Sequence, residues 1–282
     1  MSRHRRRPII FLLHEGAIGN IIERFSISKR QRFIIAVILL SAGLFASQYI
    51  LGKSGVVFCL LLSLLTDVFF LVTNYKDIKQ NFSPFLFILP FFYSVAFGLF
   101  YFLVPARFLT RLFMTSLYAV GLYSLFLSEN IFTVASMRTI ALFSSAKTVS
   151  FIITIVSYFF LTSVVFSFDL PVIFKAIIVF IYTSFYIAHS FWSYTLEKVF
   201  APSFYYWVFG LSLCFSEFAV ILWFWPSDET FIALFLTGIF YTFVGLSHVW
   251  MDKRLFKNIL WEYIWVSAIV FLLLFLFTNW RP

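Results

Sequence analysis

Long apolar segments alternate with short polar ones along this chain, from residue 33 to residue 279. About 20 helical residues cross the hydrocarbon core of a bilayer, which is about 30 Å thick. In lipid, a helix satisfies all of its own backbone hydrogen bonds. The pattern therefore predicts an all-α, polytopic transmembrane bundle of about nine spans in residues 33–279. The predicted spans are 33–52, 55–73, 85–104, 108–128, 149–167, 171–192, 204–224, 231–250 and 258–279.

Residues 1–32 precede the first predicted span and carry a different pattern. Apolar residues recur there at helical spacing, and clusters of basic residues open and close the segment. This pattern is typical of an amphipathic helix that lies on a membrane surface. We predict a cytoplasmic leader that binds anionic lipid. The alternative is a secretory signal peptide, but the apolar stretch 8–13 is too short and no small-residue cleavage site follows it.

The positions of Lys and Arg predict the orientation of the bundle. The chain holds 21 Lys and Arg against 12 Asp and Glu, a formal net charge of +9. When the N-terminus is placed inside, most of these bases fall on inner segments, as the positive-inside rule requires. We predict a cytoplasmic N-terminus and an external C-terminus in the plasma membrane of a bacterium. The basic excess then needs no nucleic-acid partner, and we expect none.

The connection at residues 129–148 is long, half apolar and rich in Ala and Ser. If it crossed the membrane, the basic cluster at 253–257 would lie outside, against the charge rule. We predict a cytoplasmic or re-entrant segment that packs on the inner ends of the bundle. Arg138 is expected to face protein there, because its guanidinium offers five donors to neighbouring acceptors.

Two passages carry a family resemblance. They are SISKRQRFIIAVILLSAGLFASQ, from Ser26 to Gln48, and SENIFTVASMRTIALFSSAKTVSF, from Ser128 to Phe151. Both resemble an uncharacterised multipass family of candidate-phyla bacteria. The resemblance implies a multipass membrane protein but no activity, so it assigns no role to any residue.

The chain contains no HExxH, GxSxG, P-loop, GxGxxG or CxxC motif. These motifs carry the chemistry of common hydrolases, nucleotide-binding proteins and redox proteins. We therefore assign no catalytic residue, no metal ligand and no cofactor site. Cys59 and Cys214 both fall inside predicted spans, so a disulfide framework is not expected.

Ionisable residues inside spans are costly, by about 2.5–3.5 kcal/mol each on insertion scales, and are candidate functional positions. Four of them share a similar inner depth with two bases of the 129–148 connection. The candidate polar pocket comprises Asp67, Arg138, Lys147, His189, His248 and Glu262. It would serve as a proton relay or an anion site. Alternatively, these residues snorkel or hydrogen-bond separately, or the two histidines and two carboxylates bind a divalent metal.

A second candidate lies toward the outer side. Glu217 is about 10 Å inside its predicted span, while Arg111 and Lys175 lie one turn inside theirs. Pairing of Glu217 with Arg111 or Lys175 would lower the cost of burying both charges. Otherwise, the two bases simply extend toward the headgroups.

Three functions remain open at this point. The favoured one is a non-catalytic membrane component that binds a membrane protein partner or lipid through its basic cytoplasmic face. The second is a transporter or channel for a small solute or ion. The third is an intramembrane enzyme acting on a lipid-like substrate, which would need a converging acid, base and anion site near Asp67, His189 and Arg138.

The predicted topology is tested by labelling single cysteines in a Cys-free background. A cysteine at Ser227 should react with an impermeant maleimide from outside, whereas one at Lys253 should react only after the membrane is opened. Reaction of both from the same side would rule out the predicted topology.

Overall fold

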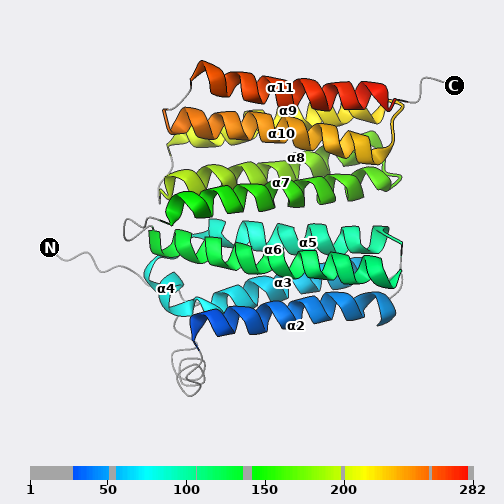
Figure 1. Ribbon diagram of the computed structural model, residues 1–282. Helices are drawn as coiled ribbons and strands as arrows, with labels where there is room; N and C mark the ends of the chain where they lie inside the picture. Colours follow the sequence, from blue (N-terminus) through cyan, green and yellow to red (C-terminus); the bar gives the residue numbers. More distant parts are fainter. Residues whose placement is uncertain are drawn as a thin grey trace.

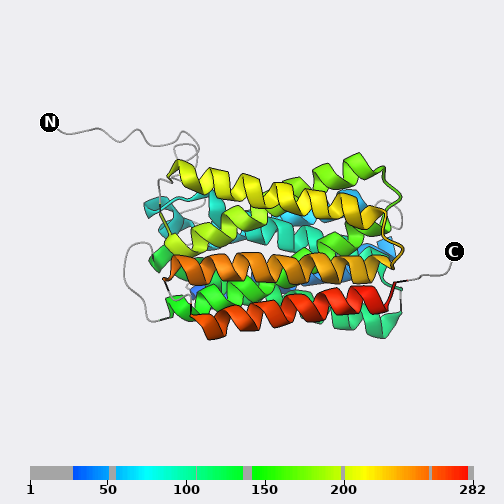
Figure 2. The ribbon, with the colours of Figure 1, turned by 90° about the horizontal axis from the view of Figure 1, so that it is seen from above.

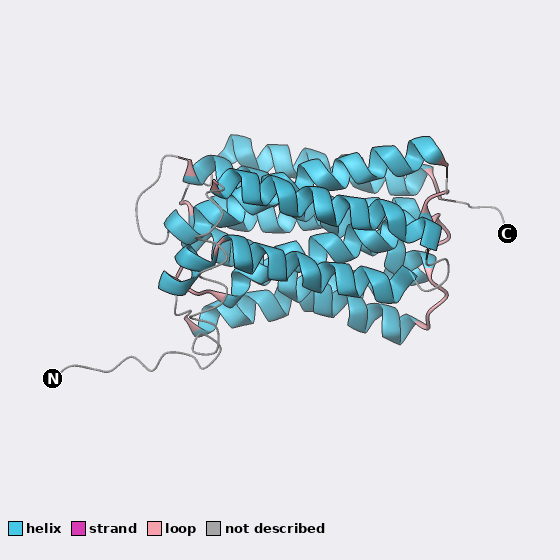
Figure 3. Ribbon diagram, turned by 90° about the horizontal axis from the view of Figure 1, so that it is seen from below, coloured by secondary structure: helices cyan, strands magenta, loops and turns pink. Residues whose placement is uncertain are grey.

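The computed structural model describes residues 28–50, 55–105, 107–135, 142–197, 201–253 and 256–278. Long helices run side by side through these ranges, and short connections join them at the two ends of a bundle (Figures 1 and 3). Ser227, in the connection between two helices, and Thr278, just after the last described helix, form an isolated β-bridge. The interfacial helix predicted for residues 1–32 lies outside the described residues, apart from its last five positions.

Each helix is named as in Figure 1. They are α2 (Lys29–Ile50), α3 (Gly55–Thr73), α4 (Tyr75–Gln80), the 3₁₀ turn η3 (Pro84–Phe87), α5 (Ile88–Leu103), α6 (Phe108–Ala135), α7 (Phe143–Ser167), α8 (Val172–Thr195), α9 (Pro202–Trp223), α10 (Glu229–Met251) and α11 (Lys257–Leu276). Within the described ranges, eight helices are long and apolar enough to cross a membrane. The helix α3 adds a shorter apolar stretch, Val57–Thr73. The predicted all-α multipass bundle is confirmed.

Successive long helices alternate in direction, which gives the bundle two distinct ends (Figure 1). We call one of them the α4 end. It holds α4, the beginnings of α2, α7 and α11, and the last turns of α6, α8 and α10. The end of α11 lies at the opposite end of the bundle. The charge rule predicts that the α4 end faces the cytoplasm.

The described parts of the predicted connection at residues 129–148 are mostly helical. Glu129–Ala135 continue α6, and α7 begins at Phe143. The extension of α6 forms because buried residues keep recurring every three or four positions, at Phe126, Glu129 and Thr133. Residues 136–141, including Arg138, lie outside the described residues.

Buried hydroxyl groups join the helices across an interior that is otherwise aromatic and aliphatic. Thr66 Oγ1 and Ser94 Oγ lie 2.9 Å apart, and Ser94 Oγ lies 2.9 Å from Tyr118 Oη, so this set links α3, α5 and α6. Between α7 and α8, Thr162 Oγ1 hydrogen-bonds to Tyr182 Oη at 2.8 Å. Such interhelical bonds contribute about 0.6 kcal/mol each on average in a membrane, and they specify which helices pair.

Gly121 lets a buried tyrosine lie against the backbone of α6. Tyr93 Oη donates a hydrogen bond to the Tyr118 carbonyl oxygen at 3.0 Å. A Cβ at Gly121 would lie 2.9 Å from Tyr93 Cζ and closer still to Oη. The close contact of α5 with α6 therefore depends on glycine at this position, although the chain contains no GxxxG motif there.

Gly121→Ala should destabilise the protein by about 1–3 kcal/mol, because the added methyl overpacks a filled site. The measurement is thermal unfolding in detergent. Gly43→Ala in α2 is the matched control, since its Cβ would lie at an ordinary 3.7 Å from Leu62 Cδ1. A Gly-to-Ala change inside a helix with such space should be neutral or stabilising. Equal melting temperatures for the two variants would contradict this account of the α5–α6 contact.

Candidate functional site at the α4 end

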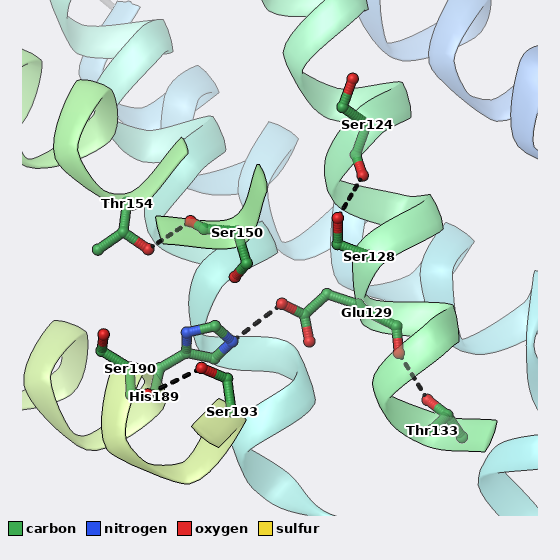
Figure 4. A network of polar contacts seen from close by, with 9 residues as sticks. All are labelled: Ser124, Ser128, Glu129, Thr133, Ser150, Thr154, His189, Ser190 and Ser193. Carbon is green, nitrogen blue, oxygen red and sulfur yellow. Dashed lines mark hydrogen bonds and ion pairs between the residues drawn. The ribbon is translucent and has the colours of Figure 1, made fainter. Parts of the chain in front are cut away.

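A buried carboxyl–imidazole pair connects α6 to α8. His189 Nε2 lies 2.9 Å from Glu129 Oε1, and neither residue is exposed to solvent. Figure 4 shows the two side chains pointing toward one another, with Ser150 of α7 and Ser193 of α8 nearby. Ionisable groups are costly in a membrane, so their pairing here is a candidate for function.

Helix geometry sets the position of this pair. Glu129 lies six residues before the end of α6, and His189 lies six residues before the end of α8. At 1.5 Å per residue, both lie about 9 Å inside the α4 end. Glu129 faces α8 together with Phe132, one turn later in α6, whose ring centroid lies 6.2 Å from that of Trp192 on α8.

The pair retains hydrogen-bonding capacity that the described residues do not use. Glu129 Oε2 and His189 Nδ1 are buried without a hydrogen-bond partner in this part of the chain. A buried polar atom without a partner is uncommon and calls for an explanation. The arrangement is chemically able to hold and pass a proton, since imidazole and carboxyl groups both bind and release protons.

A second group forms around His248 on α10. Its Nε2 lies 2.9 Å from Ser190 Oγ, and its ring stacks on Tyr194 with centroids 3.6 Å apart. Ser190 directly follows His189 on α8, so the two histidines are attached to adjacent positions of one helix. His248 is 3% exposed and its Nδ1 is also buried without a partner among the described residues.

Beyond Tyr194, a small polar pocket opens at the α4 end. It has a volume of about 280 Å³ and is lined by Phe143, Ser144, Lys147, Thr148, Tyr194 and Asp252. Lys147 Nζ lies 4.2 Å from the centre of the Tyr194 ring and 4.0 Å from Asp252 Oδ1. The lysine is mostly buried, at 15% side-chain exposure, while Asp252 is 46% exposed. We call this site the Lys147 pocket.

A separate cluster connects α2, α4 and α6 beside the Glu129 site. Lys29 Nζ donates a hydrogen bond to Asn130 Oδ1 at 2.5 Å, and it also pairs with the Asp77 carboxylate. Glu129 and Asn130 are adjacent in α6 and have partners on different helices. Glu129 connects the last turns of α6 to α8, and Asn130 connects them, through Lys29, to α2 and α4.

Among the described residues of the predicted polar pocket, the structure brings three together, and Arg138 lies outside the described residues. Lys147 and His248 share contacts with Tyr194, and His189 lies next to Ser190, which binds His248. Asp67 is half-buried on α3, and its Oδ1 is buried without a hydrogen-bond partner among the described residues. Glu262 is exposed on α11. Among the residues that the structure describes, no group of three His, Cys, Asp or Glu could hold a metal ion.

Neither of the two predicted partners of Glu217, Lys175 and Arg111, pairs with it in the described part of the chain. Lys175 Nζ donates a hydrogen bond to the Phe166 carbonyl oxygen at 3.2 Å, which caps the end of α7. Glu217 is exposed on α9, which packs along α8 (Figure 2). Arg111 lies on α6, and no hydrogen bond or ion pair in the described chain joins it to Glu217. The structure therefore does not bring this candidate ion pair together.

Sequence reasoning missed Glu129, Asn130, Tyr194 and Asp252. Glu129 and Asn130 looked like the end of a span because both are polar, yet each has a partner on another helix. A usable signal was present, since Leu122, Phe126, Glu129 and Thr133 follow the helical spacing without a break.

Glu129→Ala should lower the free energy of unfolding by about 1–3 kcal/mol, because it leaves His189 Nε2 buried without a partner. The cost of Glu129→Ala combined with His189→Ala should be less than the sum of the two single costs. Unfolding in mixed micelles measures both quantities. Glu262→Ala, at an exposed position, is the control and should have little effect. Additive costs would mean that the pair is not energetically coupled.

Comparison with known proteins gives a family but no activity. No curated protein and no solved structure matches the chain. One family model matches residues 50–277, and its description is a protein of unknown function, DUF5656. The match spans α3 to α11, with Glu129, His189 and the Lys147 pocket inside it. Because this match covers far more than half of the sequence, the chain belongs to the DUF5656 family.

Proposed function

We propose that this protein is a non-catalytic component of a bacterial plasma membrane that binds the anionic headgroup of a phospholipid in the Lys147 pocket. The α4 end then faces the cytoplasm, as the charge rule predicts. The observation that carries the proposal is a mostly buried lysine that lines a polar pocket at the ends of membrane-spanning helices. Basic pockets between such helices on the cytoplasmic side are typical sites for anionic headgroups.

The chemistry of the pocket suits a phosphate group. Ser144 lies three residues before Lys147 and four residues before Thr148, so both of these residues lie near it on one side of α7. They lie within two turns of the beginning of α7 at Phe143, where free backbone N–H groups and the helix dipole favour an anion. Lys147 adds a full positive charge to this favourable end.

The surroundings of the pocket favour an anion as well. Lys253 and Lys257 belong to the same end of the bundle, and basic residues near an anionic surface contribute about 1 kcal/mol each. Asp252 opposes an anion, but its contact with Lys147 is long and its carboxylate is largely exposed. An ion pair this long, with Asp252 at the surface, is weak, so a phosphate bound to Lys147 replaces it at little cost.

Transport of protons or a small ion is the second candidate. The buried Glu129–His189 pair favours it, because ionisable pairs inside membrane proteins mark proton and ion paths. Reconstituted vesicles loaded with a pH-sensitive dye distinguish the two candidates. A proton flux that Glu129→Gln removes would support transport. A flux no higher than that of empty vesicles, for wild type and Glu129→Gln alike, would favour the lipid-binding component.

Headgroup binding is tested by native mass spectrometry of the purified protein with phosphatidylglycerol and with phosphatidylcholine. Wild-type protein should retain phosphatidylglycerol preferentially. Lys147→Gln should weaken this binding roughly tenfold, the scale of losing one hydrogen bond to a charged group. Lys257→Gln is the matched control, since it removes the same charge from an exposed position at the same end.

The purified protein has no anionic bilayer surface to attract Lys257, so the control should bind nearly as well as wild type. Equal weakening by Lys147→Gln and Lys257→Gln would show diffuse surface attraction instead of a pocket. Unchanged binding by Lys147→Gln would overturn the proposed site.

A further inference from the structure

Glu217 is an exposed carboxyl group in the interior of a membrane-spanning helix. It lies on α9, six residues before the end of that helix at Trp223. The residues that follow it, FAVILWFWP from 218 to 226, are all apolar up to Ser227. Glu217 makes no hydrogen bond or ion pair with the described residues. Its carboxyl group therefore faces the surroundings of the bundle about 9 Å inside the helix end.

This position is unfavourable if lipid alone covers α9. A charged group at the centre of a span costs about 2.5–3.5 kcal/mol on insertion scales, and ionisable residues normally face protein or a wet cavity. The glutamate side chain is too short to reach the headgroups from this depth. By contrast, the exposed Glu262 lies near the beginning of α11, four residues after Asn258 and five after Lys257, where the chain is polar.

The same face of α9 is shaped for close contact with another helix. Tyr206, Gly210, Leu213, Glu217 and Ile221 recur at three- and four-residue spacing and form one stripe, all of it exposed. Gly210 has open space where its Cβ would be, so it serves no packing purpose within the bundle. Glycine on a membrane helix lets a second backbone approach closely. In Figure 2, α9 lies at the edge of the bundle.

We propose that this stripe of α9 is the contact between two copies of this chain in the membrane. In a symmetric dimer each surface patch meets its own equivalent, so Glu217 of one copy faces Glu217 of the other. Two carboxyl groups that share a proton are complementary, because the protonated group donates and the other accepts. The stripe is thus self-complementary at Glu217, and Gly210, about two turns earlier, allows the two helices to approach closely.

Cys214 supplies a natural probe for this contact. It is exposed on α9, three residues from Glu217, whereas Cys59 is buried in α3. Membranes that contain the full-length protein are treated with an oxidant or a short bis-maleimide reagent. We expect a cross-linked dimer that Cys214→Ser removes and Cys59→Ser leaves intact.

Substitutions within the stripe separate a specific contact from random collision. Glu217→Leu and Gly210→Leu should each reduce the cross-linked fraction roughly threefold or more, the scale of one interhelical hydrogen bond in a membrane. Glu217→Gln should retain the dimer, because an amide also donates and accepts. The matched control is Ile269→Cys in a Cys214→Ser background, an exposed position within α11.

The Ile269 control should cross-link only weakly. Cross-linking that is insensitive to Glu217→Leu and Gly210→Leu, or equal at Ile269, would overturn the proposal. So would a product in which Cys214 is joined to a different protein. Size-exclusion chromatography of each variant verifies that it remains folded and monodisperse. Phospholipid binding at the Lys147 pocket is unaffected by either result, so the two proposals fail independently.

Discussion

A lipid bilayer offers no hydrogen bonds, and the arrangement of this bundle follows from that constraint. Every polar side chain on a spanning helix has to find its partner within protein or at a membrane surface. The hydroxyl set of Thr66, Ser94 and Tyr118 satisfies this need among α3, α5 and α6. Glu129 and His189 do the same between α6 and α8. Polar groups thus determine which helices are neighbours, while apolar packing fills the space between them.

The α4 end shows where such groups accumulate. Lys29, Asn130 and Asp77 connect α2, α4 and α6 there, and Lys147 extends over the Tyr194 ring toward Asp252. Polar side chains are less costly near a membrane surface than at its centre, so a binding site is easier to build at this depth. The Lys147 pocket combines this depth with the favourable beginning of α7.

Much of the fold could be predicted from hydropathy, because length and apolar composition decide whether a helix spans a membrane. The bounds of α6 could not, since Glu129 and Asn130 look like the end of a span until their partners on α8 and α2 are known. The site was predicted only in part for the same reason. Depth predicted one level for Lys147, His189 and His248, but depth does not fix the direction of a side chain. Asp67 and Glu262 were predicted at the same level, yet Asp67 is only half-buried and Glu262 is exposed.

The contact of Lys29 with Asn130 also has a consequence for biosynthesis. The two residues are 101 positions apart, so at 5–20 residues per second the ribosome needs about 5–20 s to make the second after the first. Asp77, the other partner of Lys29, lies only 48 positions after it and is therefore available earlier. Until Asp77 is synthesised, the Lys29 ammonium stays hydrated at the surface, which holds the beginning of α2 at that level. The contact between α2 and α6 through Lys29 and Asn130 forms only after α6 has been synthesised.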